Sequence, residues 1–142
     1  MMNARINSFK IFQEVSEDIY LKINKEKPNS TFDYIIAFTV NCALACELGM
    51  KAIAAEHYIE LKGHNLSDLF NKLEAEEQSF IKSKMPSLVD KSDNSKEFDN
   101  YIKVVATNFV DWRYFYEKGM QTNWLFLHEL MNAIDLFFDG HS

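Results

Sequence analysis

The sequence predicts an all-α protein, and two observations lead to this fold class. The chain of 142 residues has only four glycines and two prolines, too few for the many turns of a β-sandwich or barrel. Apolar side chains recur at helical spacing, and the stretch from Ile35 to Met50 is apolar enough to require enclosure by other helices. We therefore expect one domain over residues 1–142, folded as an up-and-down bundle of four to five main helices.

The first half of the chain is expected to form two helices. In residues 4–25 these apolar side chains lie at helical spacing: Ile6, Phe9, Phe12, Val15, Ile19 and Ile23. Pro28 disfavours helix in the residue before it, and the polar residues that follow can cap a second helix over residues 32–62. That helix would be about 45 Å long at 1.5 Å per residue, so we expect it to project from the bundle or to kink near Gly49. Gly63 is the expected C-terminal cap.

Three further helices are expected, two before a loop and one after it. Asn65 or Ser67 can cap a short helix, and residues 74–85 continue in helical pattern. The Ser-, Asp- and Asn-rich residues 86–95 are expected to form a loop. A long helix is then expected over residues 96–118, closed by Gly119.

The last helix is expected from Thr122 or Asn123 to Asp139, and it carries apolar residues on two faces. Two such faces are more than one small bundle needs to bury, so we expect a homodimer through the terminal helices. The alternative is that both apolar faces pack against other helices of the same chain.

Composition limits the partners and the location. The net charge is −6 and there is no basic block, so nonspecific capture of nucleic acid is disfavoured, although a local Arg/Lys site stays possible. The two cysteines, Cys42 and Cys46, lie inside the apolar stretch and are expected to be reduced core residues. Neither a signal peptide nor a membrane span is apparent, so we expect a cytoplasmic protein with no membrane partner.

No cofactor and no metal site are expected. The four histidines are too widely spaced for a metal motif, and no acidic ligand pattern accompanies them. Nothing marks a nucleophile either, because GxSxG, Walker A and GxGxxG motifs are all absent.

Glu47 is the candidate around which a polar site can form. A carboxylate inside the apolar stretch needs a partner, because an unpaired buried charge is costly. Lys51, four residues on, is one candidate partner, and Arg113, set among aromatic residues, is another. The arginine could equally form a surface pair with Glu117. A buried structural network, a functional site and a surface pair therefore all remain open for Arg113. His64, at the expected turn, is either a structural histidine that forms a hydrogen bond across the turn or a residue of the site.

Three segments taken together resemble the HEPN superfamily of small all-helical domains from prokaryotic defence, toxin–antitoxin and nucleotide-linked systems. They are ELGMKAIAA at residues 47–55, GHNLSDLFNKL at residues 63–73 and FVDWRYFYEKG at residues 109–119. The resemblance implies a helical bundle that commonly dimerises. Active members are metal-independent endoribonucleases, in which four to six residues separate an arginine from the histidine that follows it on the same helix. Histidine manages proton transfer at the ribose 2′-hydroxyl while arginine offsets phosphate charge.

This sequence departs from that motif. Arg113 matches the arginine, but the histidine positions hold Lys118, Gly119 and Met120. Lysine, with an ordinary pKa of about 10.4, is a poor proton shuttle near neutrality. The resemblance therefore favours a non-catalytic binding or regulatory module.

Two alternatives remain. One is an endoribonuclease that uses Arg113 with His64 or Lys118, and the other is a purely structural or protein-interaction domain. RNA, a nucleotide or a protein are possible partners. The candidate binding residues are Glu47, Lys51, Tyr114, Tyr116 and Glu117.

Overall fold

A computed structural model describes residues 4–23, 31–85, 94–107 and 123–140 of the chain. Within these ranges it contains six helices and no strand: α1 (Ala4–Ile23), α2 (Thr31–Ala55), α3 (Leu66–Asn71), α4 (Ala75–Ser83), α5 (Asn94–Val105) and α8 (Trp124–Gly140). The predicted all-α bundle is confirmed.

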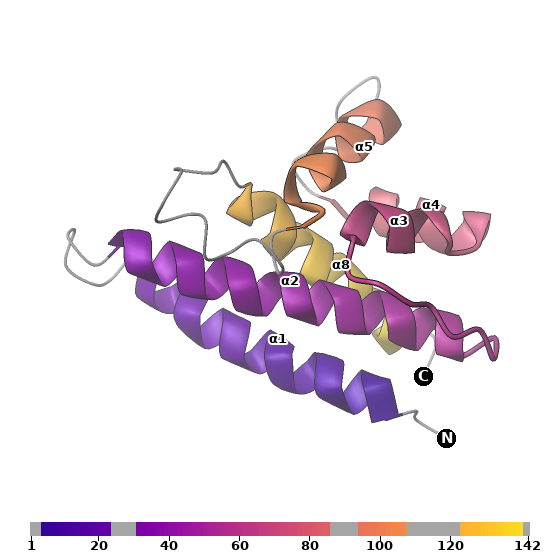
Figure 1. Ribbon diagram of the computed structural model, residues 1–142, viewed down its shortest axis with the longest axis horizontal. Coiled ribbons are helices and arrows are strands. Elements are labelled where there is room, and N and C mark those ends of the chain that lie inside the picture. The colour runs from indigo at the N-terminus through magenta and orange to yellow at the C-terminus, as the bar shows by residue number, and fades with distance from the viewer. Residues whose placement is uncertain (1–3, 24–30, 86–93, 108–122, 141–142) are drawn as a thin grey trace.

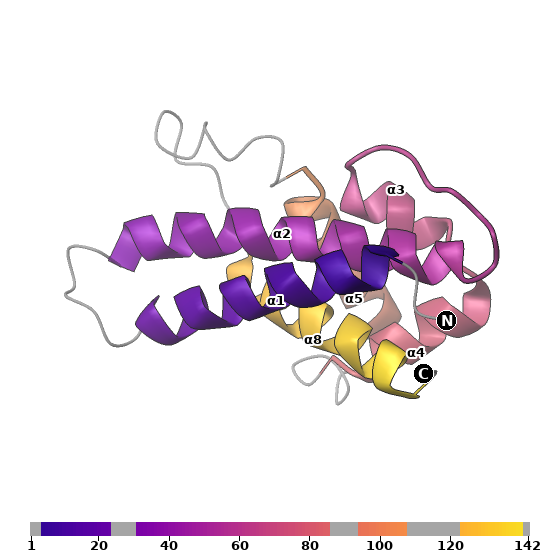
Figure 2. The same ribbon diagram turned by 90° about the horizontal axis from the view of Figure 1, so that it is seen from below.

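The two longest helices, α1 and α2, form an antiparallel hairpin, and α8 packs against both of them (Figures 1 and 2). Helix α8 runs in the same direction as α2. Near its start, Trp124 meets Phe38 of α2 with ring centroids 6.0 Å apart, and further along Ile134 lies against Gly49. The shorter helices α3, α4 and α5 lie to one side of these three (Figure 1). Helix α5 contacts the start of α8, and α4 contacts α8 near its end. The core therefore lies where α1, α2 and α8 meet, and it continues between these helices and α3, α4 and α5.

Two polar contacts hold α1 antiparallel to α8. Lys10 pairs with Asp135, and Glu17 accepts a hydrogen bond from Nε2 of His128 at 2.8 Å. The partners are seven residues apart on both helices and occur in opposite order. Burial lowers the pKa of Lys10, but the hydrogen bond and charge of Asp135 outweigh this effect and the pKa is raised overall. The lysine therefore stays charged and keeps its ion pair across the physiological pH range.

Both apolar faces of α8 are buried within this one chain. Leu127, Met131 and Ile134 face the α1–α2 hairpin side of the core, and the second face is buried as well. On that second face Phe126 packs against Phe98 of α5, and Phe137 packs against Phe80 of α4, with ring centroids 5.3 and 5.7 Å apart. The dimer predicted from the two faces stays a prediction, but thick packing inside one chain now accounts for them.

Helix α2 ends at Ala55, so its predicted extension to residue 62 is wrong. The N–H of Ile59 donates to the Ala54 carbonyl and the N–H of Tyr58 donates to the Ala55 carbonyl, the two hydrogen bonds of a Schellman cap. Tyr58 occupies the left-handed position with φ of 61°, where glycine is usual. The sequence carries no glycine or proline at this point, so the end of the helix could not be located from turn signals.

Helix α5 ends at Val105, and its predicted continuation through residue 107 is also wrong. Residues 106 and 107 form a turn, and the Ala106 carbonyl accepts the N–H of Leu66 at 2.9 Å. That bond satisfies a backbone N–H at the start of α3 that has no partner within its own helix. Helix α5 therefore ends where its C-terminus meets the N-terminus of α3. The rest of the predicted helix, from residue 108 to 118, lies outside the described residues. At α8, Asn123 caps the helix as predicted, accepting the N–H of Phe126 at 3.0 Å.

One helix, at Asp33–Ala55, is long and apolar enough by composition to cross a membrane, with a mean hydropathy of 1.4. This segment is longer than the apolar stretch from Ile35 to Met50, for which no membrane span is expected. However, 61% of the window is buried inside the protein, as in the core helix of a soluble protein. The helix is therefore weak evidence for a membrane span.

We predict that Gly49→Ala destabilises the protein by about 2 kcal/mol, because a small overpacking in a core outweighs the better helix propensity of alanine. A Cβ at this position would lie 2.6 Å from Cγ2 of Ile134 and 2.9 Å from Cδ1 of Phe9. Urea unfolding measures the effect. The double variant with Ile134→Ala, which removes the nearest clashing atom, should lose about 1 kcal/mol less than the sum of the two single changes. Strict additivity would contradict the close approach.

We predict that Tyr58→Gly stabilises the protein by about 0.5–1 kcal/mol, because glycine adopts the left-handed conformation without a Cβ penalty. The side chain of Tyr58 is 99% exposed, so its removal costs no packing. Tyr58→Ala is the matched control: it removes the same ring and keeps the strain, and its thermal midpoint should stay near that of the wild type. Equal midpoints for the glycine and alanine variants would contradict the strain.

Candidate functional site

Glu47 is the centre of the candidate site, and it lies on the buried face of α2. Its exposed fraction is 4%. Nζ of Lys51, one turn later, donates to Oε2 of Glu47 at 3.1 Å, the predicted pair in the favourable order along the helix. Nδ1 of His64 donates to the other oxygen, Oε1, at 2.9 Å. Both carboxylate oxygens therefore have a partner, which meets the requirement for burying this charge.

The segment after α2 brings His64 to Glu47. From the turn at Tyr58 the chain runs back beside the second half of α2 to reach α3 (Figure 1). Leu61 anchors this return segment in the core, and Gly63, with φ of 98°, turns the chain before His64. Asn65 then caps α3 by accepting the N–H of Asp68 at 3.0 Å. A histidine that sequence analysis placed at a turn thus meets a carboxylate seventeen residues earlier.

The arrangement fixes the orientation of the imidazole. A carboxylate only accepts hydrogen bonds, so Nδ1 of His64 carries the proton in this contact. In a neutral ring the other nitrogen is then the basic one, the arrangement that orients a histidine for proton transfer. The side chain of Lys51 is 16% exposed and that of His64 is 57% exposed. The network therefore extends from the core to the surface.

The other predicted site residues are Arg113, Tyr114, Tyr116, Glu117 and Lys118. All of them lie outside the described residues. The structure thus brings together Glu47, Lys51 and His64, and the predicted contact between Glu47 and Arg113 stays a prediction.

Sequence analysis missed a second cluster, formed by His57, Glu74 and Glu77. Nε2 of His57 donates to Oε2 of Glu77 at 2.7 Å, and Nδ1 lies 3.7 Å from Oε1 of Glu74. The hydrogen bond to Glu77 raises the pKa of His57, the charges of Glu77, Glu74 and Glu56 add to this effect, and partial burial opposes it. Sequence analysis expected no acidic partners for this histidine. The spacing of Glu74 and Glu77 signals a helix cap, but only the turn after α2 places His57 beside them.

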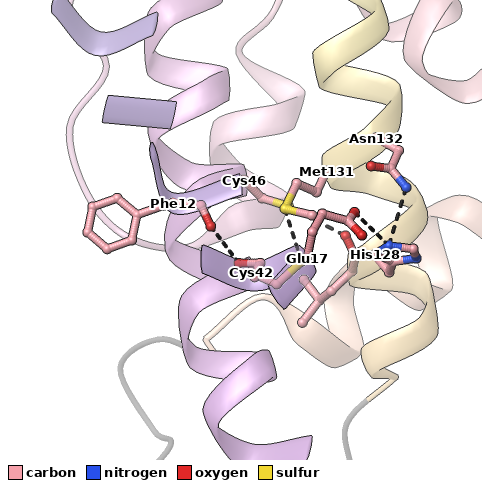
Figure 3. A network of polar contacts seen from close by, with 9 residues as sticks. Phe12, Glu17, Cys42, Cys46, His128, Met131 and Asn132 are labelled. Carbon is pink, nitrogen blue, oxygen red and sulfur yellow. Dashed lines mark hydrogen bonds and ion pairs between the residues drawn. The ribbon is translucent and has the colours of Figure 1, made fainter. Parts of the chain in front are cut away.

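A third polar contact joins α1 and α8 beside the two cysteines (Figure 3). His128 stacks on Tyr20 with ring centroids 3.9 Å apart and donates to Glu17. Beside this contact, Sγ of Cys42 lies 3.7 Å from Sδ of Met131. Burial raises the pKa of the Cys42 thiol well above its ordinary value, and the hydrogen bond to Cys46 adds to this.

Both cysteines are free and buried, as predicted. The raised pKa makes the Cys42 thiol unsuited to nucleophilic catalysis. Both cysteines are fully buried and contribute to the packing of the core.

Comparison of the chain with protein families, with curated proteins and with solved structures gives no match. The fold and site themselves define an all-α helical bundle in which a buried glutamate is paired with a lysine and a histidine.

We predict that Glu47→Ala destabilises the protein by about 3 kcal/mol, because removing one partner of a buried ion pair leaves the other charge uncompensated. Chemical unfolding measures the change. Glu60→Ala is the control: Glu60 pairs with Arg5 at 3.9 Å with both side chains exposed, and its loss should cost less than about 1 kcal/mol.

The double variant Glu47→Leu with Lys51→Met should recover most of the loss, since an apolar pair can replace a buried ion pair. A cost for Glu47→Ala no larger than that for Glu60→Ala would contradict the structural role of the network.

Proposed function

We propose that this chain is a HEPN-like helical module that binds or regulates a partner without catalysis, in a defence or toxin–antitoxin type of system. The observation that carries the proposal is the pairing of Glu47, whose two oxygens are both held inside the chain by Lys51 and His64. The network joins α2 to the return segment and to the start of α3. These contacts are typical of a structural network, and both Lys51 and His64 are engaged in it.

The sequence around Arg113 supports the same proposal. The positions at which a HEPN endoribonuclease carries its histidine hold Lys118, Gly119 and Met120.

We predict that the purified protein does not cleave RNA in EDTA. The experiment incubates labelled single-stranded RNA with micromolar protein and compares the wild type with Arg113→Ala on a gel. Equal, background-level cleavage is expected, since no group suited to proton transfer follows the arginine. Cleavage by the wild type that is lost in the variant would overturn the non-catalytic proposal.

A metal-independent endoribonuclease is the second candidate function, and one observation favours it. The contact from His64 to Glu47 orients the imidazole in the way that carboxylates orient catalytic histidines. For this function, cleavage should fall in Arg113→Ala and in His64→Ala and persist in His128→Ala, whose imidazole pairs with Glu17 on another face. Lys118→Ala tests the remaining candidate. Unchanged cleavage in all of these variants would indicate a contaminating nuclease.

We further propose that the module acts as a homodimer. Both apolar faces of α8 are buried in one chain, so the support is the resemblance to a superfamily that commonly dimerises rather than an uncovered face. Sedimentation at micromolar concentration distinguishes the states, and a mass near 16.6 kDa would contradict the dimer.

A further inference from the structure

Three metal-ligating side chains meet at the end of α2, away from the network at Glu47. His57 comes from the turn after α2, and Glu74 and Glu77 come from the start of α4. One ligand atom from each residue can be chosen so that all three lie within 4.8 Å of one another. Side chains from two separate elements thus converge on one point, as the ligands of a metal ion do.

The two carboxylates are held in place before any ligand binds. Glu74 and Glu77 form a reciprocal capping box: each side chain accepts the backbone N–H of the other residue. The side chain of Glu77 is 7% exposed, whereas His57 and Glu74 are exposed. The cluster therefore has a fixed, buried floor and an open side through which an ion and its water can enter.

The charge of the cluster is unbalanced. Among the residues that the structure describes, His57 is the sole cationic partner of Glu74 and of Glu77. A third carboxylate, that of Glu56, also acts on the same imidazole. One imidazole thus contacts two carboxylates, one of which is buried. A divalent cation would supply the missing positive charge.

We propose that His57, Glu74 and Glu77 form a binding site for a divalent transition-metal ion such as Zn²⁺. An imidazole with two carboxylates is a donor set that zinc accepts, and imidazole disfavours Mg²⁺ and Ca²⁺, which take oxygen ligands. Three protein ligands leave a position for water on the exposed side. The capping-box hydrogen bonds supply the support that ligating carboxylates need. The ion would tie the end of α2 to the start of α4.

The test is isothermal titration of the metal-free protein with zinc chloride, with cobalt(II) absorption in the visible range as a second readout of the ligand set. The wild type should bind one ion per chain. His57→Ala should weaken binding by at least about tenfold, as losing a ligand costs no less than losing a supporting contact. His64→Ala and His128→Ala are matched controls, since their imidazoles pair with other carboxylates, and they should bind as the wild type does.

Glu77→Gln is a second variant that should still fold, because glutamine can replace glutamate in the capping box but carries no charge. It should remain helical by circular dichroism and bind zinc more weakly. Two results would overturn the proposal: no saturable zinc binding by the folded wild type, which would leave His57 as a hydrogen-bonding partner of the cap only, or equal binding by the wild type and His57→Ala.

Discussion

A carboxylate buried inside an apolar helix must be paired, and the pairing of Glu47 organises much of this chain. Lys51 reaches one oxygen from the same helix, but the second oxygen needs a donor from elsewhere. His64 supplies it only because α2 stops at Ala55 and the chain runs back along it. A helix continued to residue 62 would carry His64 away from Glu47 and would expose Leu61, which the return segment buries. The early end of α2, its left-handed cap and the position of α3 are therefore linked to one hydrogen bond.

Close packing of α2 imposes a second constraint. At Gly49 the helix leaves no room for a Cβ, since Ile134 of α8 and Phe9 of α1 approach it from two sides. The three long helices thus meet around a single small residue. Contacts between α1 and α8 fix their direction on either side of this point, with Phe9 against Phe138 at one end and Glu17 against His128 at the other. Gly49, in the second half of α2, therefore marks a place where α1 and α8 approach that helix closely.

Histidine–glutamate contacts recur in this acidic protein. His57, His64 and His128 each donate to a glutamate, and each contact joins two elements. Their surroundings differ. Glu47 has a lysine as well as a histidine, and Glu17 is half-buried beside aromatic rings. At His57 one imidazole serves two carboxylates, which is why that cluster, and not the other two, is suited to a cation.

The sequence by itself determined the fold class, limited the start of α3 to Asn65 or Ser67 and that of α8 to Thr122 or Asn123, and identified Lys51 as one of two candidate partners of Glu47. These depend on helical periodicity, side-chain caps and contacts within one turn, which are local properties of the chain. Only the tertiary structure decided where α2 and α5 end, that both faces of α8 are buried, and which carboxylate each histidine meets. Those features depend on contacts between residues far apart in sequence. The N–H of Leu66 donates to the carbonyl of Ala106, and Nε2 of His57 donates to the carboxylate of Glu77. No local pattern encodes such contacts, because their partners are set by packing.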